Sequence, residues 1–294
     1  MTDHHTPDLT PWVALSLIPS LGSRRIAALL DHFGSIEAVL EAGDAELRTV
    51  PGIGPKLAAA IRAVDSARTA SEIADWQADG IALLLRGSDG YPGALNMLAD
   101  APPVLFWRGS LGQDDSRAVA VVGRRSPTAA SRLLAEDLSG ALAGQGWTIV
   151  SGLAAGVDTA AHRAVLQAGG RTLAVLGCGV RVIYPPENAP LVAQILTRGA
   201  LLSETHPDLP PSGPLLVARN RLISGLSRAV IVIETAEDGG SMYTARFARE
   251  QGRTVYAVDN GSAGTVRLIE EGARPLSPDG VTWEWMADDL FALG

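Results

Sequence analysis

The 294-residue sequence contains a single cysteine, a single lysine and few aromatic residues. Because Cys178 has no second cysteine to pair with, an intramolecular disulfide is impossible, which fits a reducing compartment. No apolar stretch reaches the roughly 18 uncharged residues that cross a bilayer. The N-terminal MTDHHTPDLTPW lacks the basic patch and apolar core of a secretory signal. We therefore expect a cytoplasmic protein without a membrane segment.

Positive charge is also scarce. The net charge is −8 and the isoelectric point is near 5.1, which argues against a protein coated in nucleic-acid-binding surface. Any such site must be a local patch on an acidic body. Lys56 is the only lysine, so the patch would consist of arginines, whose planar fork donates two parallel hydrogen bonds to a phosphate. A GC-rich genome also replaces lysine with arginine throughout a protein. The positions of the arginines are therefore better evidence for a phosphate site than their number.

Signatures of catalysis and of cofactor binding are missing. No H-E-x-x-H or Cys/His ligand spacing is present, which excludes the common zinc sites, and there is no G-x-S-x-G nucleophile motif. Gly177–Gly179 begins like a dinucleotide fingerprint, but Val182 replaces the third glycine. No Gly-Lys-Ser/Thr loop is found either. We expect no metal, no cofactor and no enzymatic activity.

Asp158 and His162 allow two interpretations. They lie four residues apart on one face of a predicted helix that follows Ser151, so a Ser–His–Asp relay is conceivable. The favoured interpretation is structural: Asp158 caps the helix, and His162 bonds to neighbouring backbone.

The N-terminal region, residues 1–76, is predicted to be a small all-helical domain. Apolar residues recur at helical spacing in three segments: Arg25–Phe33, Ile36–Leu40 and Lys56–Ile61. Two segments resemble each other: IPSLGSRRIAALL (Ile18–Leu30) and VPGIGPKLAAAI (Val50–Ile61).

The second of these repeats resembles a helix-hairpin-helix motif of the SAM-like type. Gly52 and Gly54 would leave backbone N–H groups facing a phosphate at a helix N-terminus, with Lys56 beside them. This predicts a secondary DNA contact. A tight turn that serves packing alone explains the same residues equally well.

The remainder, residues 77–294, is predicted to be an α/β domain with a mostly parallel sheet and helices on both faces. Runs such as VAVV and AVIVI are apolar at consecutive positions, which is typical of strands buried on both sides. The predicted strands are Ile81–Leu85, Val104–Trp107, Val119–Val122, Thr148–Val150, Thr172–Leu176, Ala200–Ser203, Ala229–Ile233 and Thr254–Val258. The predicted helices are Ala129–Ala143, Thr159–Ala168, Pro190–Leu196, Ser241–Gln251 and Val266–Glu271.

Glycine-rich loops follow several of these strands. In parallel sheets ligands bind beyond the carboxyl ends of the strands, where glycine permits close approach and helix N-termini offer unpaired N–H groups. The loops are Gly123–Thr128, Ser151–Asp158, Gly177–Gly179 and Glu234–Ser241. Arg124, Arg125, Arg219 and Arg221 could add charge. Together these features predict a phosphate pocket.

Long segments of the chain match a known family in family order. They are YPGALNMLADAPPVLFWRG, VAVVGRRSPT, IVSGLAAGVDTAAHRAVL, TLAVLGCGVRVIYPPEN, LLSE, RNRLISGLSRAVIVIE and GGSMYTARFAREQGRTVYAV. The chain resembles the DNA-processing protein A family, also called DprA or Smf, over about residues 80–273.

The resemblance implies an extended Rossmann-type domain that binds single-stranded DNA without reading its sequence. It also implies a homodimer that protects incoming DNA and loads the RecA recombinase during natural transformation. The implied DNA-binding residues are Gly123, Arg124, Arg125, Ser151, Gly152, Ala155, Gly156, Arg219, Asn220, Arg221, Gly239, Gly240 and Ser241. Arg125 falls on the family's phosphate-binding arginine.

The chain departs from the family pattern at several positions. Arg124 replaces a small hydroxyl residue, and Ala155 stands where a basic residue is common. Our hypothesis is that Arg124 compensates for Ala155. Leu216-Val217 replaces an aromatic-Pro pair, and Asp259-Asn260 replaces Pro-Gly. Many members carry a C-terminal winged helix, and we expect none within this sequence.

Two other interpretations stay open. One is a nucleotide phosphoribohydrolase of the lysine-decarboxylase-like type, but Asp238–Thr244 lacks the proline and third glycine of its hallmark, and no glutamate closely follows. Glu234 or Glu204 would have to be catalytic. The other is an interaction module in which the glycine loops serve only the fold.

Two kinds of contact are predicted less directly. Leu268 and Ile269 are candidates for an apolar dimer contact. Tyr184, Tyr243 and Trp147 could stack on bases, although packing is the favoured role for each, so phosphate contacts should dominate DNA binding.

Overall fold

The computed structural model describes residues 8–110, 115–278 and 283–293. The chain divides into two compact units: Met1–Tyr91 with Ala99–Phe106, and Pro92–Leu98 with Trp107–Gly294. This division falls later than the predicted boundary at residue 77, because the Trp76 ring packs edge-on against Phe106 at 5.4 Å within the first unit. Residues 1–7 lie outside the described residues. They belong to the N-terminal segment that is expected to lack a secretory signal.

The first unit is mainly helical, as predicted. Its elements are α1 (Thr10–Ser16), α2 (Ser23–Phe33), α3 (Ile36–Glu41), α4 (Asp44–Leu47), α5 (Pro55–Arg62), α6 (Ser66–Ala78), β1 (Ile81–Leu85) and the first half of β2 (Val104–Gly109). The apolar residues that predicted the helices, such as Leu29, Val39 and Ile61, are buried in one core cluster. The three helices predicted from periodicity are therefore confirmed.

The two similar segments form two similar hairpins. Ser20 and Gly52, each with a left-handed backbone (φ 67° and 83°), precede α2 and α5 respectively. The Arg25 guanidinium donates to the carbonyl oxygens of both residues, at 2.7 Å to Ser20 and 3.0 Å to Gly52. One arginine thus joins the two hairpins of the first unit.

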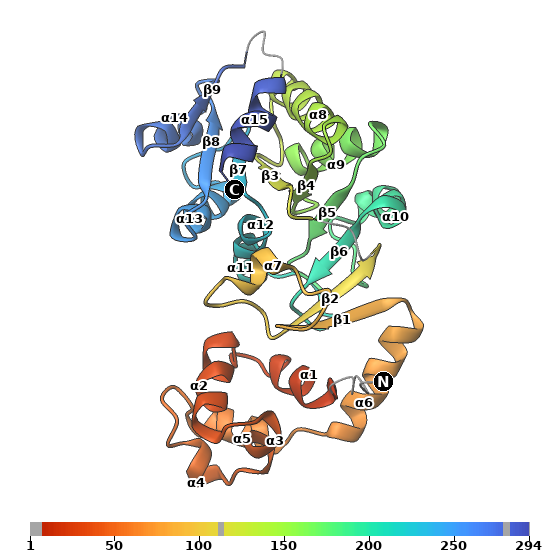
Figure 1. The fold of residues 1–294 in the computed structure, drawn as a ribbon, viewed down its shortest axis with the longest axis vertical. Helices are drawn as coiled ribbons and strands as arrows, with labels where there is room; N and C mark the ends of the chain where they lie inside the picture. The colour runs from red at the N-terminus through yellow and green to blue at the C-terminus, as the bar shows by residue number, and fades with distance from the viewer. Residues whose placement is uncertain (1–7, 111–114, 279–282, 294) are drawn as a thin grey trace. The chain divides into compact units, whose positions relative to one another are not determined.

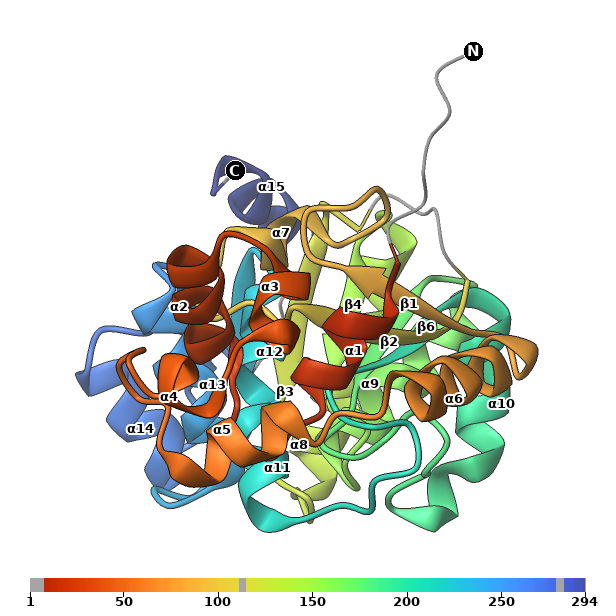
Figure 2. The same cartoon turned by 90° about the horizontal axis from the view of Figure 1, so that it is seen from below.

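The second unit is built on a parallel sheet (Figures 1 and 2). Its strands are β3 (Ala118–Val122), β4 (Thr148–Ser151), β5 (Thr172–Val175), β6 (Ala200–Ser203), β7 (Ala229–Val232), β8 (Thr254–Val258) and β9 (Arg274–Leu276). They lie in the order β6-β5-β4-β3-β7-β8-β9, and each neighbouring pair is parallel. All residues of β3, β4, β5, β6 and β7 are buried, which explains their uninterrupted apolar sequences.

Helices cover both faces of this sheet, as predicted. They are α7 (Gly93–Asn96), α8 (Ala129–Gly144), α9 (Val157–Gln167), the 3₁₀ turn η1 (Pro186–Asn188), α10 (Ala189–Arg198), α11 (Gly213–Ala218), α12 (Asn220–Gly225), α13 (Gly240–Glu250), α14 (Ala263–Glu270) and α15 (Glu284–Ala292). Figure 1 shows α8, α9 and α10 on one side and α12, α13 and α14 on the other. Right-handed crossovers produce this split, because the chain proceeds from β3 in one direction and from β7 in the other.

The order of the strands creates a topological switch point. β3 lies between β4 and β7, so the loops that leave β3 and β7 diverge to opposite faces of the sheet. Ligands of open parallel sheets bind in the crevice that such a divergence creates. The site is therefore expected beyond Val122 and Val232.

Candidate nucleic-acid interface

A cavity of about 450 Å³ lies at the switch point. Its walls come from the loops after β3 and β7, from the first turn of α13, and from α11 and α12. The predicted site residues that line it are Gly123, Arg124, Arg125, Arg219, Asn220, Gly239, Gly240 and Ser241. Leu216 and Val217, at the family's aromatic-Pro position, contribute apolar wall.

A smaller cavity of about 60 Å³ adjoins the first. Arg125 and Arg219 line both, and Gly152, Ala155 and Tyr184 line only the smaller one. Tyr184 is 37% exposed, so part of its ring is accessible at this cavity. Trp147, by contrast, is buried and has the predicted packing role.

The glycines beside the two arginines serve a close crossing of backbones. Gly156 has a left-handed conformation (φ 80°), and a Cβ there would lie 2.5 Å from the Arg125 carbonyl oxygen. A Cβ on Gly123 would lie 2.7 Å from a methyl of Val157. The Val157 N–H donates to the Arg124 carbonyl oxygen at 3.2 Å. Gly156 therefore positions the arginine loop and does not itself line either cavity.

Arg219 has a structural role that the sequence did not predict. The residue is 7% exposed, and its guanidinium donates to the carbonyl oxygens of Gly152 and Val175. Burial lowers the pKa of Arg219, and the nearby Asp158 carboxylate partly offsets this effect. Its donors face backbone carbonyl oxygens, so Arg219 braces the cavity wall. The predicted contact of Arg219 with DNA stays a prediction.

Asp158 occupies the place where the sequence suggested a phosphate. Its Oδ2 accepts hydrogen bonds from the N–H groups of Gly152 (3.0 Å) and Ala154 (3.3 Å). The intervening Leu153 is left-handed (φ 60°). Burial raises the pKa of Asp158, and Arg219 partly offsets this. The expected capping role was wrong: the carboxylate reaches back to the preceding loop, whose amides are thereby occupied.

Two other predicted site residues point elsewhere. The Arg221 guanidinium pairs with Glu204, its side chain is only 14% exposed, and it lines neither cavity. The Ser151 hydroxyl is buried and donates to the Val121 carbonyl oxygen at 2.7 Å. Both side chains hold the fold together, and the predicted DNA contact of each stays a prediction.

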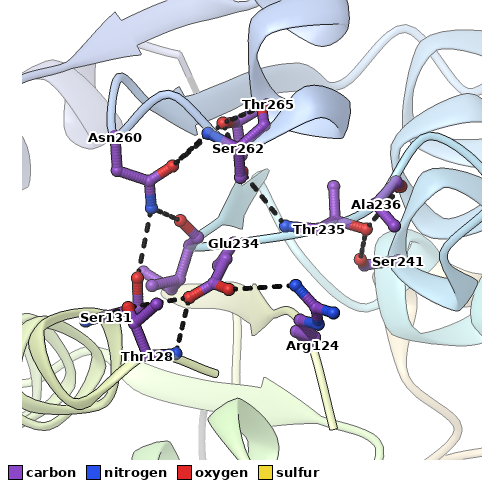
Figure 3. Close-up of polar contacts among 11 residues, drawn as sticks. Arg124, Thr128, Ser131, Glu234, Thr235, Ala236, Ser241, Asn260, Ser262 and Thr265 are labelled. Carbon is purple, nitrogen blue, oxygen red and sulfur yellow. Dashed lines mark hydrogen bonds and ion pairs between the residues drawn. The ribbon is translucent and has the colours of Figure 1, made fainter. Parts of the chain in front are cut away.

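Glu234 organises the side of the cavity nearest β7 (Figure 3). Its Oε2 accepts from the N–H (2.9 Å) and hydroxyl (3.0 Å) of Thr128, which caps α8, and its Oε1 lies 3.5 Å from Arg124 Nη1. Burial works to raise the pKa of Glu234, but the hydrogen bonds from Thr128 and Ser131 and the charge of Arg124 outweigh it, so the pKa is lowered. Arg124 therefore points toward β7, whereas Ala155 follows β4 on the other side of β3. Its proposed compensation for Ala155 stays a hypothesis.

Asn260 has a structural role that the sequence did not predict. The sequence analysis noted this residue only because Asp259-Asn260 replaces Pro-Gly. Its amide donates to the Ile233 carbonyl (2.8 Å) and the Ser131 hydroxyl (3.2 Å). Its oxygen accepts from the Ser262 N–H (3.2 Å) and the Thr265 hydroxyl (3.1 Å), as Figure 3 shows. The side chain thus ties the ends of β7 and β8 to the first turns of α8 and α14.

The conceivable Ser–His–Asp relay is not assembled. His162 Nδ1 lies 2.7 Å from the Thr172 hydroxyl, which itself donates to the Ile149 carbonyl. Nδ1 therefore carries the proton and donates. His162 bonds to a side chain, not to backbone as expected. Its Nε2 is buried without a partner among the described residues.

Replacing His162 with Gln should reduce the acid sensitivity of folding. Burial, and secondly the charge of Arg219, lowers the pKa of His162 from 6.5 to about 3. At a pH between these two values, the unfolded chain binds a proton at this histidine and the native state does not. The free energy of unfolding is therefore unaffected by this histidine above about pH 6.5, and it falls by up to about 1.4 kcal/mol per pH unit below that pH. Urea unfolding at pH 7.5 and pH 4.5 measures the difference, and an unchanged pH dependence in the variant would contradict the assignment.

The predicted dimer contact requires a correction. Leu268 is 1% exposed and is therefore buried within its own chain. Ile269 is partly exposed, and its neighbour on the outer face of α14, Val266, is 37% exposed. Only Ile269 of the predicted pair remains a candidate.

Among residues 8–110, 115–278 and 283–293, no cluster of His, Cys, Asp and Glu could hold a metal ion. Within the same described ranges, none of the helices is long and apolar enough to span a bilayer.

The architecture and the site together define a class: a parallel α/β protein whose ligand cavity, lined by arginines and a helix N-terminus, lies at the topological switch point. Residues 82–284 match the family described as DNA recombination-mediator protein A, and the chain belongs to this family. Residues 14–64 match a SAM-like helix-hairpin-helix tandem, in agreement with the two hairpins of the first unit.

Relatives in sequence and in structure agree with this assignment. DNA processing protein DprA of Bacillus subtilis is 38% identical over 225 residues, which cover 74% of this chain and 73% of the relative. Protein Smf of Synechocystis is 36% identical over 272 residues, covering 89% and 68%. The crystal structure of DNA processing protein A from Streptococcus pneumoniae superimposes with a TM-score of 0.77 at 33% identity, covering 90% and 92%. The Helicobacter pylori protein, whose structure was described for its single-stranded DNA binding mode, gives 0.63 at 30% identity, covering 72% and 96%.

Proposed function

We propose that this protein binds single-stranded DNA through its backbone, without reading sequence, and does no covalent chemistry on it. The observation that carries the proposal is the switch-point cavity with Arg125 on its rim. Arg125 is exposed and makes no ion pair with any residue that the structure describes. The single-stranded DNA described for the H. pylori relative supports the same ligand.

The composition of the cavity suits a single strand. Phosphates would meet Arg125 and the first turn of α13 at Gly240 and Ser241, where unpaired N–H groups and the helix dipole favour negative charge. Apolar wall from Leu216 and Ile223 offers a surface to a base. A single strand can turn its bases into such a wall, whereas a duplex keeps them paired.

Tyr184 is the proposed stacking platform of this site. The ring is partly exposed and lines the smaller cavity beside Arg125. A base on this ring would leave its phosphate within reach of the arginine, and every base has a face that can stack. Stacking of this kind adds affinity without sequence preference.

Binding should weaken steeply with salt. With roughly three to six phosphates engaged, the logarithm of the binding constant should fall with the logarithm of salt at about −0.7 per phosphate, a slope between about −2 and −4. Fluorescence anisotropy of a labelled oligothymidylate from 50 to 300 mM salt measures it, with a duplex of equal length as the comparison. A slope near zero would reject phosphate neutralisation as the source of affinity.

The wider role is inferred from the family. We propose that the bound strand is protected and passed to the RecA recombinase in the cytoplasm, and that the protein acts as a homodimer with Ile269 near the contact. The hairpin residues Gly52, Gly54 and Lys56 are proposed as a secondary DNA contact, because the two glycines precede α5 and Lys56 lies in its first turn.

The enzymatic alternative has little support from the site. Glu234 is bonded to Thr128 and Arg124, and Glu204 pairs with Arg221, so each candidate acid has a structural partner. Incubation with adenosine monophosphate should release no adenine; release would favour the phosphoribohydrolase.

A further inference from the structure

The two adjacent arginines at the cavity have different electrostatic surroundings. Arg125 makes no ion pair with a described residue, whereas Arg124 faces the Glu234 carboxylate. The pair is asymmetric: the Arg124 side chain is 54% exposed and the Glu234 side chain only 4%.

The Glu234 carboxylate is held in place by hydrogen bonds, whereas the Arg124 side chain can move away from it. The carboxylate is anchored through Oε2 by both hydrogen bonds from Thr128, and only Oε1 faces the arginine, at 3.5 Å. An ion pair with one exposed partner and a single long contact contributes little to stability. A phosphate offers the same guanidinium two parallel, shorter hydrogen bonds. Exchange of carboxylate for phosphate is therefore easy, but the carboxylate remains nearby.

We propose that Glu234 is a built-in competitor for Arg124, which holds this arginine back from DNA and so sets the strength and salt dependence of binding. The inference rests on the proposed function. Arg125 anchors the strand. Arg124 adds to the binding free energy only the difference between its interaction with a phosphate and its interaction with the Glu234 carboxylate. Binding is thereby kept weaker than two adjacent arginines would otherwise make it.

The test is a double-mutant cycle with Glu234→Gln and Arg124→Ala. Gln retains an oxygen that can accept from Thr128 but loses the charge. Glu234→Gln should tighten oligothymidylate binding by about three- to tenfold at 50 mM salt and steepen the salt slope by up to about 0.7, the contribution of one more phosphate contact. In the Arg124→Ala background the same substitution should change affinity by less than about twofold.

Two comparisons make the result decisive. Glu204→Gln removes the same charge but from a pair with Arg221 that lines neither cavity, so it should leave affinity within about twofold. In otherwise wild-type protein, Arg124→Ala should cost less than about fivefold, far less than Arg125→Ala; this arm does not require Glu234→Gln to fold. The proposal is overturned if Glu234→Gln weakens binding or leaves it unchanged, if it tightens binding equally without Arg124, or if the two arginines are equally important. Failure of the Arg125 variants to lose affinity would instead overturn the proposed function.

Discussion

Arg125→Glu should reduce the affinity for single-stranded DNA by at least about 100-fold, roughly 3 kcal/mol. A charge-assisted hydrogen bond contributes about 1.5–3 kcal/mol, and reversing the charge adds repulsion. Arg125 lines both cavities and is exposed, and it forms no ion pair with an acid in the part of the chain that the structure describes. No other arginine of the site combines these properties, because Arg219 is engaged with backbone carbonyls and Arg124 with Glu234.

The matched control is Arg163→Glu. Arg163 is also exposed and lies in the same unit, but it lines a separate surface pocket between α9 and α10. Arg163→Glu changes the net charge by as much as Arg125→Glu does. It therefore measures how much of the loss of DNA affinity comes from long-range repulsion. Anisotropy titrations of both variants at 100 mM salt decide the matter. Similar affinities for Arg125→Glu and the control would support the interaction-module interpretation, in which the glycine loops serve only the fold.

Asp158→Ala should lower the free energy of unfolding by about 3–5 kcal/mol. The substitution leaves the buried Arg219 guanidinium without its neighbouring carboxylate, and it removes the acceptor for the Gly152 and Ala154 amides. Leaving a buried guanidinium and two buried amides without their acceptor or nearby opposite charge is far more costly than an isolated surface change. The loop that carries the left-handed Leu153 would lose both of its hydrogen bonds to this carboxylate.

Urea unfolding at pH 7.5 measures this loss, with Asp158→Asn as the comparison. Asn keeps an oxygen that can accept from one of the two amides, so it should destabilise less than Ala. Because the loop contributes a wall of the smaller cavity through Gly152 and Ala155, the Ala variant should also bind single strands more weakly at temperatures where it is folded. A change in unfolding free energy below about 1 kcal/mol would show that the pair is not a structural brace.

The architecture of the sheet could be predicted because it depends on patterns that are local in sequence. Consecutive apolar residues predicted β3 and β7, and glycine after each predicted where the ligand cavity opens. Several elements were not predicted, among them β9, which is short and contains Pro275, and α11, none of whose residues is buried. Neither has the apolar periodicity from which elements are inferred.

The roles of individual charged side chains were much harder to predict. The sequence placed Arg219 and Arg221 near the predicted cavity, but it did not show where their guanidinium groups point. That direction depends on carbonyl oxygens and acids far away in the chain. Gly152 and Glu204, their respective partners, are 67 and 17 residues distant. Asp158 is the instructive case: a glycine-rich loop that binds an anion was correctly anticipated, but the anion is the protein's own carboxylate.

The most direct test of the account is the structure of this protein with a bound oligothymidylate. We expect a backbone phosphate within hydrogen-bonding distance of the Arg125 guanidinium, the strand continuing toward the first turn of α13, and a base against Tyr184. An oligonucleotide bound elsewhere, with the switch-point cavity empty or closed by side chains, would contradict the central claim.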